Sequence, residues 1–152
     1  MRSAMGLQDP PPVVHDVGPT NETTPIKAEA HLIRVRELLR EMSHKAGLGL
    51  VDETKVVTAG SELARNILKY TLPAGGQAHV DVIAWEGRGG LRAVFEDKGP
   101  GIPDVALAMT DGYSTGRSLG LGLPGSRRLV DEFSIDSKVG VGTRVVIVKW
   151  KR

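Results

Sequence analysis

The chain has 152 residues, which is enough for one domain with a substantial core and too few for two domains of ordinary size. Apolar residues make up 40% and charged residues 25%, which is typical of a globular protein and excludes a disordered chain. The 20 Lys and Arg nearly balance the 18 Asp and Glu, so the net charge of +2 argues against a nucleic-acid partner. Cysteine is absent, which excludes disulfides, thiolate metal sites and a cysteine nucleophile.

The N-terminal residues show no targeting signal. Residues 1–18 lack an apolar core after a basic start, and no apolar run approaches the roughly 18 residues that cross a bilayer. We therefore expect a cytoplasmic protein with no membrane partner. Five of the nine prolines fall in the first 25 residues, which predicts a flexible segment over 1–24, with 12–17 as a candidate edge strand. The folded domain is then expected over 25–152.

Two helices are expected at the start of this domain. Apolar residues step by three and four over 28–46, and Gly47 follows as a stop signal. A second apolar stripe predicts a helix over 53–70, with Asp52 as its N-cap.

Four strands and a third helix are expected in the rest of the chain. The strands are predicted over 79–85, 91–96, 133–138 and 143–150, with a hairpin loop over 86–90 and a helix from Pro124 to about 132. This order predicts an α+β fold, a two-layer sandwich with helices on one face of a mixed, mainly antiparallel sheet.

One flank of the second predicted helix carries polar residues beside the apolar stripe. Glu62 and Asn66 lie about 40° apart on a helix of 3.6 residues per turn, and Lys69 falls on the same flank. Carboxylate and amide oxygens suit Mg²⁺, and a lysine suits a phosphate. Polar pairs four residues apart are also common on solvated helix faces, so this flank alone fits both interpretations.

A glycine-rich turn follows the second predicted strand. Gly99 and Gly101 allow backbone torsions that other residues resist, and they allow a ligand to approach the backbone closely. Asp97, at the end of the strand, could accept a hydrogen bond from an exocyclic amine such as that of adenine. The alternative is a tight turn in which this Asp bonds its own backbone.

Two later segments have a similar composition. Gly120 and Gly122 precede the third predicted helix, where free N–H groups could face an anion, although a hinge would use the same residues. Gly142 and Thr143 open the last predicted strand, and only the Thr hydroxyl there hints at a ligand. The composition of 103–119 is typical of a mobile lid.

Several common motifs are missing. The sequence has no P-loop, no dinucleotide-binding glycine loop and none of the signature motifs of the eukaryotic protein kinases. Its four histidines show no metal-binding spacing.

Taken in order, the four segments resemble the boxes of the ATPase superfamily shared by DNA gyrase, heat-shock chaperones, sensor histidine kinases and mismatch-repair proteins, known as the GHKL superfamily or Bergerat fold. Residues 62–66 resemble its N box, 97–101 and 120–122 its two glycine boxes, and 142–143 its late Thr box. Four boxes in the right order are a more specific signal than any one of them.

Longer sequence stretches resemble one particular family within this superfamily. The chain is similar to the serine/threonine switch kinases of bacterial partner-switching pathways, which are relatives of the anti-sigma-factor kinases and include the stressosome switch kinase. The resemblance covers roughly 46–150, and its most specific stretches are 61–66, 111–115, 119–125 and 127–133.

The resemblance implies a role for each matching residue. Glu62 would act as the general base toward a substrate hydroxyl, and Asn66 would hold Mg²⁺. Asp97, supported by Thr143, would bind the adenine amine. The other residues that it implies for ATP binding are Lys69, Gly99, Gly101, Ile102, Gly120, Leu121, Gly122 and Leu123.

The resemblance also implies the partners. ATP and Mg²⁺ would be the cofactors, and the acceptor would be a serine or threonine of a STAS-domain antagonist or scaffold protein. Release from that scaffold would free the kinase to activate a PP2C-type phosphatase. The alternative is a nucleotide-binding regulatory module that acts by sequestering a partner without significant kinase activity. Glu62 is present in either case, so phosphate transfer to a partner is what distinguishes them.

Overall fold

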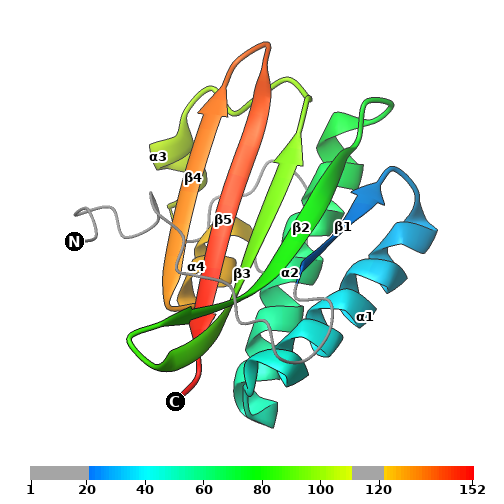
Figure 1. Ribbon diagram of the computed structural model, residues 1–152. Helices are drawn as coiled ribbons and strands as arrows, with labels where there is room; N and C mark the ends of the chain where they lie inside the picture. The colour runs from blue at the N-terminus through cyan, green and yellow to red at the C-terminus, as the bar shows by residue number, and fades with distance from the viewer. Residues whose placement is uncertain (1–20, 111–121) are drawn as a thin grey trace.

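The computed structural model describes residues 21–110 and 122–152. They form a five-stranded sheet whose described helices all lie on one face (Figure 1). The elements in chain order are β1 (Asn21–Ile26), α1 (Glu29–Ala46), α2 (Leu50–Thr71), β2 (Gly76–Trp85), β3 (Arg88–Asp97), α3 (Val105–Ala108), α4 (Gly122–Arg128), β4 (Glu132–Lys138) and β5 (Gly142–Trp150). The predicted α+β two-layer sandwich is confirmed.

The sheet has the strand order β1-β2-β3-β5-β4, and every pairing between the described strands is antiparallel. Its register aligns one residue from each of four strands near one end: Gly76 faces Asp97, Asp97 faces Thr143, and Thr143 faces Ser137. Because side chains alternate along a strand, this row lies on the same face as the apolar residues that pack against the helices.

Helix α1 follows its sequence pattern closely. Its buried face includes Leu32, Val35, Leu39 and Met42, which belong to the predicted apolar stripe. The helix ends at Gly47, whose φ of 80° is left-handed and favours glycine, and whose N–H donates to the carbonyl of His44 at 3.0 Å.

Helix α2 begins three residues earlier than predicted. Gly49 occupies the N-cap position without a side-chain cap, so the prediction that Asp52 caps this helix is wrong. Asp52 instead lies in the first turn, and its Oδ1 is 3.6 Å from the ammonium of Lys149 in β5. A long-range ion pair therefore uses the carboxylate that local sequence assigned to the cap.

A glycine places α2 close to its neighbours. A Cβ atom at Gly60 would lie 2.3 Å from Cδ1 of Leu39 in α1 and 3.2 Å from the ring of Phe95 in β3. Any larger residue would push the helix away from both layers. This close contact sets the depth at which the polar flank of α2 lies beside the sheet.

Other boundaries also differ from the sequence-based expectation, and strand β2 begins at Gly76, three residues before its predicted start. The β2–β3 turn is the dipeptide Glu86-Gly87, and Gly90 belongs to β3 because the Trp150 ring occupies the space of a side chain, 2.6 Å from a built Cβ. Helix α4 ends at Arg128, about four residues before the predicted end. The short helix α3 lies in the segment predicted as a lid, of which 111–119 fall outside the described residues.

The beginning of the domain remains a prediction. Strand β1 lies at the edge of the sheet and extends across the boundary expected after residue 24. The candidate edge strand over 12–17 falls outside the described residues. Among the residues that are described, no helix is long and apolar enough to span a bilayer.

Candidate functional site

Asp97 ends β3 on the helix side of the sheet. Its Oδ1 accepts a hydrogen bond from the N–H of Gly99 at 2.9 Å, so the local bond typical of a tight turn is present. The other oxygen, Oδ2, has no partner among the described residues, and the side chain is half-buried. The turn therefore orients the carboxylate and leaves one oxygen available to a ligand.

Two glycines bring the following loop close to its neighbours. A Cβ atom at Gly99 would lie 2.7 Å from Cγ2 of Thr71, in the last turn of α2. Gly101 has a left-handed φ of 78°, and a Cβ there would lie 2.4 Å from the carbonyl oxygen of Lys138. Only glycine fits at either position, so the loop is held between α2 and the β4–β5 hairpin.

Two hydroxyls connect this loop to the sheet. Ser137 and Thr143 face each other across β4 and β5, with 2.7 Å between their oxygens. The N–H of Ile102 donates to the Ser137 hydroxyl at 2.8 Å, and the N–H of Gly140 donates to the carbonyl of Pro100 at 2.9 Å. Thr143 is therefore held beside Asp97, its cross-strand neighbour.

The sequence interpretation missed Ser137. Strand alternation places Phe133, Ile135 and Ser137 on one face, and the first two pack against the core under the helices. A polar residue at the end of an inward-facing apolar series was the available signal.

Glu62 is a buried acid without a partner. Its residue is 7% exposed, and its carboxylate has no hydrogen bond or ion pair with any described residue. The neighbouring Ser61 faces α1, where its hydroxyl accepts a hydrogen bond from Nε of Arg36 at 3.2 Å. By helix geometry Glu62 and Asn66 then lie on the flank of α2 away from α1. A largely enclosed acid without a partner among the described residues is unfavourable, which points to an interaction with a ligand.

The remaining predicted residues have mixed outcomes. Lys69 is exposed, and its ammonium lies 5.2 Å from the centre of the Tyr70 ring, which gives it no contact with the other predicted site residues. Gly122 has a left-handed φ of 68° at the start of α4, and Leu123 packs against the core. Gly120, Leu121 and the motif over 111–115 lie outside the described residues.

The described residues offer few ligands for a metal ion. Over 21–110 and 122–152, no group of three His, Cys, Asp or Glu could hold one. Mg²⁺ usually takes only one or two protein ligands and completes its shell with water and phosphate oxygens. The amide of Asn66 therefore fits a Mg²⁺ that arrives with a nucleotide.

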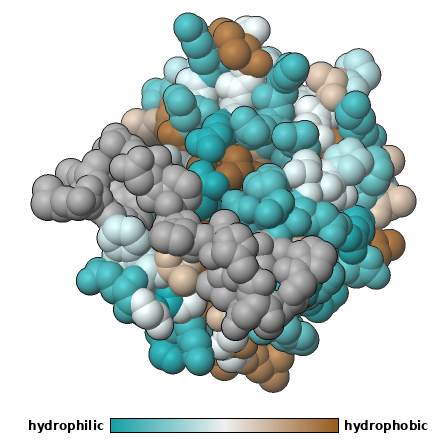
Figure 2. Space-filling model, viewed as in Figure 1, coloured by the Kyte–Doolittle hydropathy of each residue, from teal (hydrophilic) through white to brown (hydrophobic). Residues whose placement is uncertain are grey.

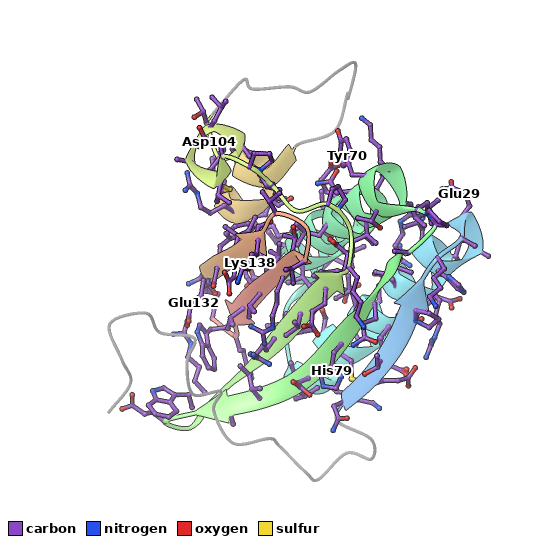
Figure 3. All side chains as sticks on the ribbon, turned by 90° about the horizontal axis from the view of Figure 1, so that it is seen from above. Glu29, Tyr70, His79, Asp104, Glu132 and Lys138 are labelled. Carbon is purple, nitrogen blue, oxygen red and sulfur yellow. The ribbon has the colours of Figure 1, made fainter. Side chains whose placement is uncertain are left out.

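A groove of about 780 Å³ crosses the same end of the sheet. Asp97 and Thr143 contribute to its wall, but Glu62 and Asn66 do not. Glu96 and Arg144 also line it, and they belong to the opposite face of the sheet. The groove therefore extends beyond the candidate site, which we place on the helix side of the sheet, where Asp97 and Thr143 lie. Seen from above, Tyr70 and Asp104 lie on the helix side of the sheet end that carries Lys138 (Figure 3).

Comparisons with known proteins agree with this arrangement. A model of the histidine kinase-like ATPase domain family matches residues 25–149. The serine/threonine-protein kinase RsbT of Bacillus subtilis (strain 168) is 45% identical over 127 residues, which cover 84% of this chain and 94% of RsbT.

Solved structures share the fold at lower identity. The structure of the RsbU and RsbW domains of Rv1364c from Mycobacterium tuberculosis matches with a TM-score of 0.62 and 20% identity, over 88% of this chain and 33% of that longer chain. The mycobacterial sensor histidine kinase MprB matches with a TM-score of 0.54 and 20% identity, over 87% of this chain and 98% of that one. The chain therefore belongs to the histidine kinase-like ATPase domain family, and within it to the serine/threonine kinases of the RsbT type.

Proposed function

We propose that this chain transfers the γ-phosphoryl group of ATP, with Mg²⁺, to a serine or threonine of a STAS-domain antagonist or scaffold protein in the cytoplasm. The observation that carries the proposal is the residue Glu62, which is 7% exposed and has no hydrogen bond or ion pair with any described residue. Asn66 follows it by one helical turn, and Oδ2 of Asp97, at the end of β3, has no partner in the described part of the chain. Glu62 would act on the acceptor hydroxyl, Asn66 would bind the metal ion, and Asp97 would bind the adenine ring.

The proposed nucleotide contacts combine these side chains with the second glycine box, of which Gly120 lies outside the described residues. Oδ2 of Asp97 would accept a hydrogen bond from the adenine amine, and the Thr143 hydroxyl, bonded to Ser137, would support it. Backbone N–H groups at Gly120, Gly122 and Leu123 would face the phosphates. Bound Mg²⁺, held by the amide oxygen of Asn66, would neutralise phosphate charge during transfer.

Glu62 would act as the general base. The acceptor hydroxyl oxygen bonds to the γ-phosphorus while the bond from that phosphorus to the β–γ bridging oxygen breaks, which leaves ADP. The hydroxyl proton goes to the Glu62 carboxylate. Such reactions depend mainly on positioning and charge stabilisation, so one base and a few oriented groups are sufficient.

The proposed STAS-domain scaffold would also regulate this kinase. Phosphorylation of the scaffold would release this kinase, which would then activate a PP2C-type phosphatase. Binding would matter as much as chemistry in such a switch, because the kinase acts on the second protein only when the first no longer holds it.

The test uses the purified full chain, Mg-ATP and purified STAS-domain proteins from the same organism. Intact mass should show the gain of one phosphoryl group on a serine or threonine of one STAS protein. Nucleotide binding without any transfer would overturn the kinase proposal and favour a module that acts by sequestration.

The role of Asn66 can be tested separately by calorimetry with ADP. Asn66→Ala should abolish the gain in affinity that Mg²⁺ gives, while leaving binding in EDTA unchanged. Arg65→Ala, the exposed neighbour on the same helix, is the matched control. An equal gain from Mg²⁺ in both variants would remove Asn66 from the metal site.

A further inference from the structure

The groove at the end of the sheet continues onto the face that turns away from the helices. There the register places one polar residue from each of four neighbouring strands in a single row, formed by Gln77, Glu96, Arg144 and Asp136. Because side chains alternate along a strand, this row faces away from the row that holds Asp97 and Thr143. The outer part of the groove therefore has no role in the proposed reaction.

Glycines keep the floor of the groove free of side chains. A Cβ atom at Gly142 would lie 2.1 Å from the carbonyl oxygen of Asp97 and 3.0 Å from Cα of Lys98, and Lys138 is the cross-strand partner of the same glycine. Gly76 is equally confined at the start of β2, where a Cβ atom would lie 2.1 Å from a backbone carbonyl oxygen. Long side chains thus line a floor of bare backbone, which a ligand can approach closely.

The groove has an excess of unpaired cations. Three exposed lysines that line it have no ion pair with any described residue, namely Lys27, Lys98 and Lys138. The fourth cation, Arg144, lies 3.6 Å from Oε2 of Glu96, so these two charges balance each other. On the outer row this leaves Asp136 as the acid without an ion pair in the described part of the chain. The groove therefore attracts a negatively charged ligand.

Exposed apolar side chains adjoin these cations at the tip of the β4–β5 hairpin. Val139 and Val141 are 63% and 58% exposed, and Val141 also lines the groove. Figure 2 shows an apolar area among hydrophilic side chains at the top of the molecule, where this hairpin tip lies in Figure 1. Exposed apolar groups favour a protein partner. A single-stranded nucleic acid would instead use aromatic side chains, and none of the described residues that line the groove is aromatic.

The width of the sheet sets the length of the occupant. Lys27 follows β1 at one edge and Lys138 ends β4 at the other, and the four strand spacings between these edges make about 19 Å. An extended chain covers that distance with about six residues. We propose that the groove binds an extended segment of about six residues from a partner protein, with acidic side chains toward the three lysines and an apolar side chain against Val139 and Val141.

This surface is separate from the residues proposed for phosphoryl transfer. Glu62 and Asn66 belong to α2 on the helix side, whereas the polar row of the groove lies on the opposite face of the sheet. The kinase could therefore hold a partner protein by this groove while its nucleotide site is occupied. Loss of this binding would leave the proposed catalytic roles unaffected, and the reverse also holds.

The first test follows the backbone amide signals of the isotope-labelled full chain by NMR during titration with a synthetic peptide. The peptide Leu-Glu-Asp-Glu-Asp-Glu has blocked ends, and its matched control, Leu-Gln-Asn-Gln-Asn-Gln, replaces each acid with its amide. We expect shifts around Lys27, Lys98 and Val141 with the acidic peptide alone, which weaken as salt screens the charges. No shifts, or equal shifts with both peptides, would overturn the proposal. Tighter binding of a thymidine hexanucleotide would replace it with a nucleic-acid site.

A second test exchanges the charges. Lys98→Glu/Lys138→Glu should weaken binding of the acidic peptide by about tenfold or more, because two attractions become repulsions, and should create binding of the basic peptide Leu-Lys-Arg-Lys-Arg-Lys. Arg40→Glu/Lys151→Glu makes the same change at exposed cations outside the groove and should alter neither affinity. Circular dichroism checks that both variants fold. Equal losses in the two variants would show that the groove lysines do not select the ligand.

The apolar end of the groove has a test of its own. Val139→Ser/Val141→Ser should weaken binding of the acidic peptide that begins with Leu, but not of one that begins with Ser, because only the first has a side chain to pack against the valines. An unchanged affinity for the first peptide would exclude both valines from the binding surface and overturn the proposed match.

Discussion

The start and the middle of helix α2 differ in how their buried acids are paired. Near its start, the ammonium of Lys149 is enclosed and lies 3.6 Å from Asp52 and 3.5 Å from Asp131. Oε1 of Glu53, in the same turn, lies 2.6 Å from Nε2 of His44. Further along the helix, Glu62 is as buried as Glu53 but has no partner among the described residues. Charge paired within the chain supports the fold, whereas buried charge left unpaired is available to a ligand.

The largest effect should follow from removing the unpaired acid. Glu62→Gln should slow phosphoryl transfer by roughly 10²- to 10⁴-fold, because a general base is lost, while nucleotide affinity and stability stay near those of the wild type. Single-turnover transfer to the acceptor protein measures the rate. Glu53→Gln, an equally buried acid with a partner, should transfer at the normal rate but unfold more easily. Equal transfer rates in the two variants would remove Glu62 from the chemistry.

Breaking the paired cluster should affect stability instead. Lys149→Met leaves Asp52 and Asp131 facing each other, and removal of one member of a buried ion pair costs about 3–5 kcal/mol. Arg152 also reaches both carboxylates, so we expect a loss near 3 kcal/mol in urea unfolding. Lys98→Met, at an exposed lysine, should change little. A loss below about 1 kcal/mol would show that the cluster is no more than a surface ion pair.

The contrast between the start and the middle of α2 also explains what the sequence could and could not predict. The stripe of α1 and the polar flank with Glu62 and Asn66 depend only on helix periodicity, and both are in the structure as expected. Asp52 was misassigned because its partner, Lys149, lies almost one hundred residues away in the sequence. Local preference cannot show that a long-range ion pair uses the carboxylate.

The environment of several glycines also depends on contacts that are distant in the sequence. Gly90 has the composition of a loop, yet it is in a strand because the Trp150 ring fills the space of its side chain. Gly99 and Gly101 are predicted to let a ligand approach the backbone, which stays a prediction, whereas the fold shows that they also lie close to Thr71 and the Lys138 carbonyl. Composition predicts that a glycine is needed, and tertiary packing decides whether a turn, a strand or a ligand needs it.

The next effect in size concerns nucleotide affinity. Asp97→Asn should weaken ADP binding by about 1.5–3 kcal/mol, as expected for the loss of a charged hydrogen bond. The loop should stay intact, because Oδ1 is retained and still accepts a hydrogen bond from the N–H of Gly99. Asp104→Asn is the matched control, since Asp104 also accepts a backbone N–H, that of Leu107, at 3.0 Å. Calorimetry with ADP separates the two. Unchanged ADP affinity in the Asp97 variant would show that the adenine ring binds elsewhere.

The smallest expected effect tests whether the two hydroxyls act as one unit. Ser137→Ala removes the acceptor for the Ile102 N–H and the partner of Thr143, and should weaken ADP binding by about 0.5–1.5 kcal/mol. Thr143→Ala should cost a similar amount. Because their oxygens are 2.7 Å apart, the double variant should lose less than the sum of the single losses. Additive losses would mean that Thr143 meets the nucleotide without help from Ser137, and that Ser137 only fixes the glycine loop.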